Sequence, residues 1–154
     1  MKATQLLKKD HATVKGLFAR FRHTSNRAQK ARQGLVDRIA TELEVHAQIE
    51  EEIFYPAMRA VPKAAPLLEE AHEEHEQVKS LVAEMQSAYD AEAIAEKVAE
   101  LRQAVLHHAT EEEREMFPLA EGLGRETLQQ LGQQLHARKQ QIKNGLLGRA
   151  KRAM

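Results

Sequence analysis

The chain states one pattern twice: HAQIEEEIFYP at residues 46–56 returns as HATEEEREMFP at residues 108–118. Each copy begins with His-Ala, carries a Glu four residues after the His, and ends in an aromatic residue followed by Pro. A second pair is also similar, with DHATVKGL at residues 10–17 and EHEQVKSL at residues 74–81. We therefore predict two helical hairpins that face each other with approximate two-fold symmetry.

Apolar residues recur with a helical period in five stretches, separated by residues that are typical of helix ends. The composition agrees, because helix formers abound and the chain has only seven Gly and four Pro. We predict an all-α single domain over residues 1–154, built as an up-and-down antiparallel four-helix bundle with an additional C-terminal helix. The bundle is expected over about residues 3–118 and a basic amphipathic helix over about 126–147. The five stretches are about 3–22, 28–60, 66–89, 92–117 and 126–147.

The absence of cysteine narrows the chemistry that this chain can perform. Disulfides, iron–sulfur clusters and thiolate zinc sites are excluded, so any metal must be held by His, Asp or Glu. No stretch approaches the ~20 apolar residues that span a bilayer, and the N-terminal segment lacks the apolar run of a secretion signal. We expect a cytoplasmic protein without a membrane segment.

The formal net charge is zero but unevenly distributed. No acid follows Glu126, whereas six basic residues do, which leaves 17 basic against 23 acidic residues in the segment 1–126. Such a tail can contact nucleic acid, a membrane or an acidic partner, or it can fold back on its own acidic bundle. We favour the fold-back and expect no nucleic-acid binding, because no recognition motif accompanies the charge. The six residues are Arg138, Lys139, Lys143, Arg149, Lys151 and Arg152.

The helical period places His46 and Glu50 where core residues are expected. In their helix Ile39, Leu43 and Ile53 precede and follow them at steps of three or four residues. Residues four apart share one face of a helix, so the imidazole and the carboxylate lie side by side on the apolar stripe.

The other repeated residues follow the same rule. His108 and Glu112 continue an apolar run, and His11 and His75 align with the apolar residues of the first and third helices. Every bundle helix thus aims one histidine inward. An ionised Glu in an apolar core costs several kcal/mol unless a positive charge compensates it, and a divalent cation is the natural compensation.

For any single residue of this set the alternative is structural, a buried histidine hydrogen-bonded to a neighbouring carboxylate. Six such residues at repeated positions favour metal ligation instead. Two sets of two His and one carboxylate with open positions suit non-haem iron, whereas structural zinc ordinarily has a closed four-ligand shell. Manganese and zinc stay open, because the affinity order alone does not select iron. The predicted ligands are His11, His46, Glu50, His75, His108 and Glu112.

These motifs resemble the hemerythrin-like, or HHE cation-binding, family over about residues 5–118. The family pattern is an acid-His pair, then H-x-x-x-E-E ending in an aromatic residue and Pro, then E-H, then H-x-x-x-E. The resemblance implies an up-and-down four-helix bundle around two non-haem iron ions, joined by an oxo or hydroxo bridge. It also implies that Glu50 and Glu112 bridge the irons while the histidines complete each shell.

The chain resembles the oxygen-carrying hemerythrins less closely. Those proteins place two histidines four apart on the third helix and a bridging aspartate five residues after the last histidine. Here His72 and His75 are three apart, and Glu112 follows His108 by four. His72 can share a face with His75 as a further ligand, but the acids around it also suit a solvated surface, and both interpretations stay open.

The shell looks more like that of bacterial hemerythrin-like proteins associated with peroxide breakdown, iron handling, or response to oxygen and nitric oxide. Our leading hypothesis is a di-iron centre that reacts with hydrogen peroxide or dioxygen, with catalase-like disproportionation as one concrete form. The alternative is a module that carries, stores or senses oxygen, nitric oxide or iron without turnover. A third hypothesis is a structural metal bundle that recruits a partner through its basic fifth helix.

Several residues near the motifs receive weaker predictions. His107 lies off the apolar stripe and is interpreted as a surface or supporting residue. Glu51, Glu111 and Glu113 are expected on solvated faces, although Glu51 or Glu111 could hydrogen-bond a ligand histidine and fix its tautomer. Tyr55 precedes one of the two prolines that are expected to end the ligand helices, and a hydrogen-bonding or redox role for it is the minor interpretation.

Overall fold

The computed structural model describes the backbone of residues 1–153 and the side chains of residues 1–148. These residues form helices and no strand. Two helices of the bundle continue into a shorter one, and short 3₁₀ turns lie in two connections, at Pro62–Ala64 and Glu121–Leu123. In chain order the α-helices are α1 (Ala3–Arg22), α2 (Gln29–Ile49), α3 (Tyr55–Met58), α4 (Ala65–Ser87), α5 (Ala91–Glu111), α6 (Phe117–Ala120) and α7 (Arg125–Ala153).

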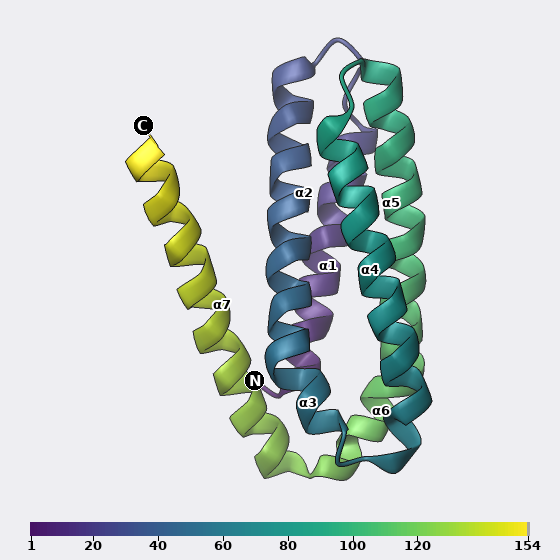
Figure 1. Ribbon diagram of the computed structural model, residues 1–154, viewed down its shortest axis with the longest axis vertical. Helices are drawn as coiled ribbons and strands as arrows, with labels where there is room; N and C mark the ends of the chain where they lie inside the picture. The colour runs from purple at the N-terminus through teal and green to yellow at the C-terminus, as the bar shows by residue number, and fades with distance from the viewer. Residues whose placement is uncertain (154) are drawn as a thin grey trace.

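Four long helical rods run up and down beside one another (Figure 1). The rods are α1, α2 with α3, α4, and α5 with α6, and short connections make consecutive rods antiparallel. The additional helix α7 starts beneath the bundle and rises along the side formed by α1 and α2. The predicted all-α bundle with an additional C-terminal helix is confirmed.

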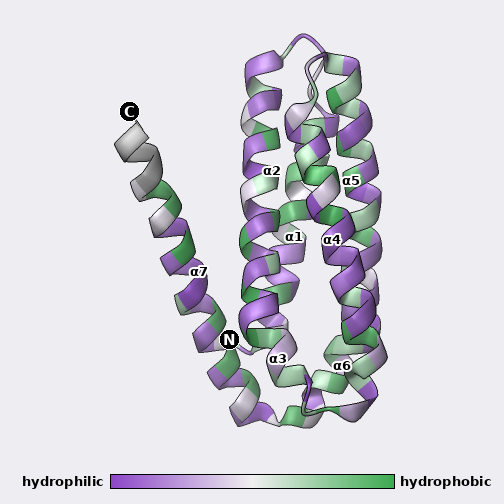
Figure 2. Ribbon diagram, viewed as in Figure 1, coloured by the Kyte–Doolittle hydropathy of each residue, from purple (hydrophilic) through white to green (hydrophobic). Residues whose placement is uncertain are grey.

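Two apolar clusters fill the bundle, one at each end. The upper cluster in Figure 1 includes Phe18 and Ile39, and the lower one includes Leu7, Phe54 and the buried face of α7. Both clusters consist of side chains that recur at helical spacing on inward faces, while hydrophilic residues cover the outside (Figure 2). A layer of polar side chains lies between the clusters, so apolar packing encloses it from above and below.

Both repeated segments contain a π-helical turn, at Glu50–Phe54 and at Glu112–Met116. In each turn the residue before the proline donates its N–H to the carbonyl five residues earlier. A proline has no N–H, and its ring crowds the carbonyl four residues before it, so a widened turn accommodates Pro56 and Pro118 without a break. The expectation that these prolines end the ligand helices is wrong, because each rod continues for one further turn.

The fifth helix packs on the bundle through an apolar stripe and through ion pairs. Leu128, Leu131 and Leu135 are buried in the lower cluster. A β-carbon added at Gly132 would overlap the carbonyl oxygen of Met1, so the absence of a side chain permits the close approach of α7 to the N-terminal segment.

Three of the six basic residues of the tail pair with acids of the bundle. Arg138 Nε lies 2.7 Å from Glu52 Oε2, and Lys143 Nζ lies 3.0 Å from Glu42 Oε1. Lys139 Nζ reaches Asp10 Oδ1 at 2.5 Å. The fold-back interpretation therefore holds for these three residues. The side chains of Arg149, Lys151 and Arg152 lie outside the described residues. Among the described helices, none has the length and the apolar character needed to cross a membrane.

Candidate metal centre

The polar layer consists of one histidine from each rod and the two glutamates that open the π turns. Each histidine is at most 7% exposed, and Glu50 and Glu112 are 0% and 2% exposed. The structure thus brings together all six residues of the predicted ligand set: His11 on α1, His46 on α2, His75 on α4, His108 on α5, Glu50 and Glu112.

The first donor group comprises His11, His46, Glu50 and Glu112, whose ligand atoms all lie within 4.8 Å of one another. Nε2 of His11 lies 3.1 Å from Glu112 Oε1, and Nε2 of His46 lies 3.1 Å from Glu50 Oε1. Two imidazoles and two carboxylates that converge in this way match the donor types of non-haem iron, manganese and zinc sites.

The second donor group comprises Glu50, His75 and His108. The Nε2 atoms of the two histidines are 3.2 Å apart, and Nε2 of His75 lies 3.2 Å from Glu50 Oε1. Glu50 therefore belongs to both groups. Glu112 also reaches both, because its Oε1 faces His11 while its Oε2 lies 3.3 Å from His108 Nε2.

The hydroxyl of Tyr55 lies inside the second donor group. It donates to Glu112 Oε2 at 2.5 Å and lies 3.1 Å from His75 Nε2. The corresponding residue of the other repeat, Phe117, has no hydroxyl and stacks on the ring of His11 with centroids 6.0 Å apart. The two donor groups are therefore chemically different despite the approximate symmetry of the hairpins.

Buried polar atoms without hydrogen-bond partners test whether a cation fits. Among the described side chains, six buried polar atoms have no hydrogen-bond partner. Two of them, Nη1 of Arg32 and Oε2 of Glu111, belong to neither donor group. The other four are Nε2 of His11, Nε2 of His46, Oε2 of Glu50 and Oε1 of Glu112. Their neighbours lie close but without hydrogen-bonding geometry, and each such orphaned group ordinarily costs about 1–3 kcal/mol. All four belong to the first donor group, so a cation bound among them would satisfy every one.

A carboxylate holds Nδ1 of each histidine from outside the layer. Asp10 bonds His46 at 2.9 Å, and Glu74 bonds His108 at 2.7 Å, each within one hairpin. Glu51 bonds His75 at 2.9 Å, and Glu113 bonds His11 at 2.7 Å, each across the two hairpins. A carboxylate on Nδ1 directs Nε2 inward as an acceptor and raises its basicity, which is the usual support of a metal-ligating histidine.

Of these four outer carboxylates, the sequence predicted only Glu51 as a possible support. The expectation that Glu113 lies on a solvated face is wrong, because it bonds Nδ1 of His11. Asp10 and Glu74 immediately precede the lone histidines, and Glu113 follows Glu112 as Glu51 follows Glu50. The repeat itself therefore contained the signal, because each acid recurs at the same place in both halves. Glu111, the other proposed support, contacts the exposed His107 instead at 3.4 Å.

Without a cation the carboxylates draw protons onto the histidines. Burial alone would lower the pKa of His46, but the charge of the adjacent Glu50 and the hydrogen bond to Asp10 raise it to about 10. Burial would also lower the pKa of His108, but the charge of Glu112 raises it to about 12. Burial would raise the pKa of Glu50, yet the charge of His46 and the close approach of the histidines hold it well below its ordinary value. The buried carboxylates of the layer therefore require compensating positive charge, which protons on the histidines supply when no cation is bound.

His72, for which both interpretations stayed open, is exposed on α4 and lies outside both donor groups, so it is not part of the buried layer. His107, which precedes His108 in the chain, is 71% exposed, as expected for a surface residue. It joins an outer group with Glu70, Glu74 and Glu111. Burial and the charges of the two neighbouring glutamates raise the pKa of Glu111 to about 8. This outer group is largely exposed, and such acidic groups are common on proteins without an ion.

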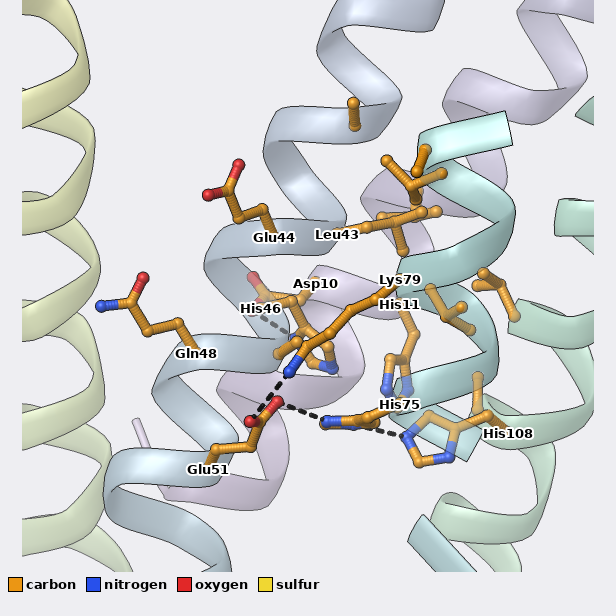
Figure 3. Close-up of a pocket in the computed structure, with 18 of the residues that line it drawn as sticks. Asp10, His11, Leu43, Glu44, His46, Gln48, Glu51, His75, Lys79 and His108 are labelled. Atoms are coloured by element: carbon orange, nitrogen blue, oxygen red, sulfur yellow. Dashed lines mark hydrogen bonds and ion pairs between the residues drawn. The ribbon is translucent and has the colours of Figure 1, made fainter. Parts of the chain in front are cut away.

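A cleft of about 580 Å³ opens between α2 and α4 and reaches the histidines. Figure 3 shows His11, His46, His75 and His108 at its inner end. Lys79 extends from α4 across the opening to α2, where its Nζ lies 3.2 Å from Glu51 Oε1. The centre is therefore buried within the bundle but accessible from one side.

An all-α bundle with interleaved histidines and glutamates at its centre defines a class of helical cation-binding proteins. A family model described as the Hemerythrin HHE cation binding domain matches residues 2–120, and the chain belongs to this family.

Known proteins resemble the chain over nearly its whole length. The uncharacterized protein Rv2633c of Mycobacterium tuberculosis is 29% identical over 150 residues, which are 96% of this chain and 91% of that protein. The crystal structure of a Hemerythrin HHE cation binding domain-containing protein, the Rv2633c homolog from Mycobacterium kansasii, superposes with a TM-score of 0.83 at 26% identity, covering 98% of this chain and 93% of that one. A DNA nickase of Nostoc is 28% identical over 97% of this chain, which spans 42% of that protein.

Proposed function

We propose that this chain is a non-haem di-iron protein that decomposes hydrogen peroxide, 2 H₂O₂ → 2 H₂O + O₂. The observation that carries the proposal is the pair of adjacent donor groups that share Glu50 and meet the inner end of an open cleft. Bound iron would supply the redox chemistry, because it can take up two electrons from one peroxide and return them to another.

In this proposal each donor group would hold one ion. The first group, with His11 and His46, would hold one ion, and the second, with His75 and His108, would hold the other. Glu50 and Glu112 reach the histidines of both groups, so these two carboxylates would help to hold both ions.

The chain's own residues handle the protons that peroxide chemistry requires. Burial, followed by the charges of Glu112 and Glu50, raises the pKa of Tyr55 well above its ordinary value, so its hydroxyl keeps its proton. That hydroxyl contacts His75 and Glu112 within the polar layer and is a neutral proton donor there. Tyr55 would therefore hold a proton for the oxygen–oxygen cleavage and recover it afterwards.

The surroundings restrict what reaches the centre. The lower apolar cluster closes the bundle below the layer, and the upper cluster forms part of the wall of the cleft. The outer carboxylates hold the histidine rings in fixed orientations. Access is left to the cleft between α2 and α4. A small neutral oxidant can enter there, whereas bulk water is limited by the apolar wall.

The test is metal content and peroxide turnover on one preparation. The chain is expressed in iron-supplemented medium, its iron is counted by elemental analysis, and oxygen evolution is followed after addition of hydrogen peroxide. We expect two irons per chain and evolution of one O₂ for two H₂O₂, and a matched zinc-loaded sample should evolve none.

Other outcomes would replace the proposal. Two irons with a reversible spectral change on oxygen or nitric oxide, and no consumption of peroxide, would identify a carrier or sensor. A folded protein that binds no metal would indicate that the six residues have only a structural role.

A further inference from the structure

The cleft is much larger than hydrogen peroxide requires. Its volume of about 580 Å³ exceeds by more than tenfold the ~30 Å³ that a water molecule occupies in the liquid. It falls instead within the roughly 300–1,000 Å³ of sites that bind organic molecules. A route for peroxide alone does not account for this size.

The wall of the cleft is divided into a polar and an apolar part. The donor histidines lie at the inner end, and apolar side chains continue from them on all four rods, toward the upper end in Figure 1. The helical rise of 1.5 Å per residue makes the distance from His75 to Val82 along α4 roughly 10 Å. The apolar part of the wall is Val14, Ala40, Leu43, Val78, Val82 and Val105.

The charges around the opening favour a neutral ligand. Lys79 is the one lysine or arginine that lines the cleft, and it is already paired with Glu51 and Glu76. Glu52 also lines the cleft and is paired with Arg138, whereas Glu44 has no ion-pair partner among the described side chains. A free carboxylate or phosphate would therefore meet the negative charge of Glu44 and no unpaired lysine or arginine at the opening. A neutral head group beside the histidines and an aliphatic chain along the apolar wall satisfy both parts of the cleft.

We propose that the cleft between α2 and α4 binds aliphatic hydroperoxides, with the peroxide group at the donor histidines and the alkyl chain along the apolar wall. This assignment names an organic substrate class for the same centre and so rests, for its chemistry, on the proposed function.

The reaction balances with hydrogen peroxide as reductant: ROOH + H₂O₂ → ROH + H₂O + O₂. The oxygen–oxygen bond of the alkyl hydroperoxide breaks and accepts two electrons and two protons, giving the alcohol and water. Hydrogen peroxide loses two electrons and two protons and leaves as dioxygen.

The binding step is tested without turnover, by titrating the zinc-loaded chain with 1-butanol, 1-hexanol and 1-octanol as inert analogues. Methyl ¹³C NMR should shift the resonances of Leu43, Val78 and Val82. Each added methylene should tighten binding about fourfold while the chain lies against the apolar wall, as expected for about 0.8 kcal/mol per buried methylene. Affinity that does not depend on chain length, or shifts elsewhere in the protein, would overturn the proposal.

Variants locate the site. Ala40→Phe and Ala83→Trp add bulk from opposite sides of the cleft. Because Ala83 is exposed, the second substitution should leave the protein folded. Each should weaken octanol binding about tenfold or more and leave the zinc content unchanged. The matched control is Ala99→Trp, on the exposed face of α5 and outside the cleft. Equal binding by all three variants would contradict the assignment.

Turnover separates this inference from the proposed function. With iron-loaded protein, 1-octyl hydroperoxide should yield 1-octanol only when hydrogen peroxide is also present, and Ala83→Trp should lose this reaction while still decomposing hydrogen peroxide. If the chain decomposes hydrogen peroxide but octanol neither binds nor forms, the inference fails and the proposed function stands. If octanol binds in the cleft but hydrogen peroxide is not decomposed, the proposed function fails and the reaction assigned here fails with it, while the cleft remains a site for neutral amphiphiles.

Discussion

The outer carboxylates are the residues that give the centre its geometry. Each bonds Nδ1 of one histidine, and together they fix four ring orientations from four different positions in the chain. Because Nε2 is then left as the inward atom, removal of one carboxylate should loosen a proposed ligand without removing it. Such a change separates metal affinity from the stability of the fold.

Glu74→Gln should lower metal affinity by about 10–100-fold, the usual effect of losing a carboxylate that supports a ligand histidine. The cause is the loss of the charged acceptor 2.7 Å from His108 Nδ1. Competition with a chromophoric chelator measures the effect. The adjacent exposed Glu73→Gln is the matched control, and equal affinities of the two variants would contradict the role of Glu74.

Tyr55→Phe should slow peroxide decomposition by about a hundredfold, within the range that a positioned proton donor contributes. The substitution makes the two repeats alike, because Phe117 already occupies the corresponding position. Iron content should stay unchanged, and oxygen evolution is the measurement. Tyr89→Phe, at a residue that is 99% exposed, should behave as the unaltered chain. A Tyr55→Phe variant with full activity would show that the hydroxyl is not the proton donor.

At the scale of elements, the sequence predicted the rods and missed the π turns at Glu50–Phe54 and Glu112–Met116. Apolar spacing located all five helical stretches, because packing demands that pattern on each inward face. The π turns were missed because the regular period was continued through them. A widened turn shifts the following residues by one position, so Phe54 and Met58 are buried where the regular period would bury Ile53 and Ala57. Pro56 and Pro118 were the available signal, and they were interpreted as helix ends although a helix can widen to accommodate a proline.

The close approach of α7 depends on one glycine. Gly132→Ala should destabilise the chain by about 1–3 kcal/mol, because the added carbon overlaps the backbone of Met1 and forces α7 to shift. Gly145→Ala is the control on the same helix, where an added β-carbon meets nothing within 4 Å. That change should instead stabilise by about 0.5–1 kcal/mol through helix propensity. Urea unfolding measures the stability of both variants. Equal unfolding midpoints would contradict the proposed contact between α7 and the backbone of Met1.

The whole molecule should respond to pH through its buried histidines. In the metal-free chain the pKa of His46 is about 10 and that of His108 about 12, both above the ordinary 6.5. A raised pKa in the folded state contributes stability that is fully present below about pH 6.5 and is lost as pH rises through the folded value. Each histidine can contribute a slope of up to about 1.4 kcal/mol per pH unit.

We therefore expect the urea midpoint of chelator-treated protein to fall between pH 6.5 and 10. The fall should be smaller after metal loading, because an ion replaces the protons and its binding strengthens as they leave. A metal-free midpoint that is flat or rises over this interval would contradict the electrostatic description of the layer.

The sequence predicted the histidines and glutamates of the site, but not the cleft that leads to them. Repetition and apolar register identified His46 and Glu50, because those positions would otherwise be filled by core residues. The register did not decide between exposure and burial for His72, which lies one turn from His75 yet points outward. The cleft depends on how far α2 and α4 stand apart, a property of packing between distant segments that no local pattern records.

Lys139 connects the C-terminal helix to the interior, since its ammonium holds one oxygen of Asp10 while the other oxygen holds His46. Whatever keeps α7 docked also keeps the ring of His46 in place. Thermodynamic linkage makes the relation reciprocal, so an ion that binds more tightly when α7 is docked must in turn hold α7 against the bundle by the same free energy. Docking of α7 should therefore change when an ion binds. A molecule that bound α7 and drew it away from the bundle would lower the affinity of the centre for the ion.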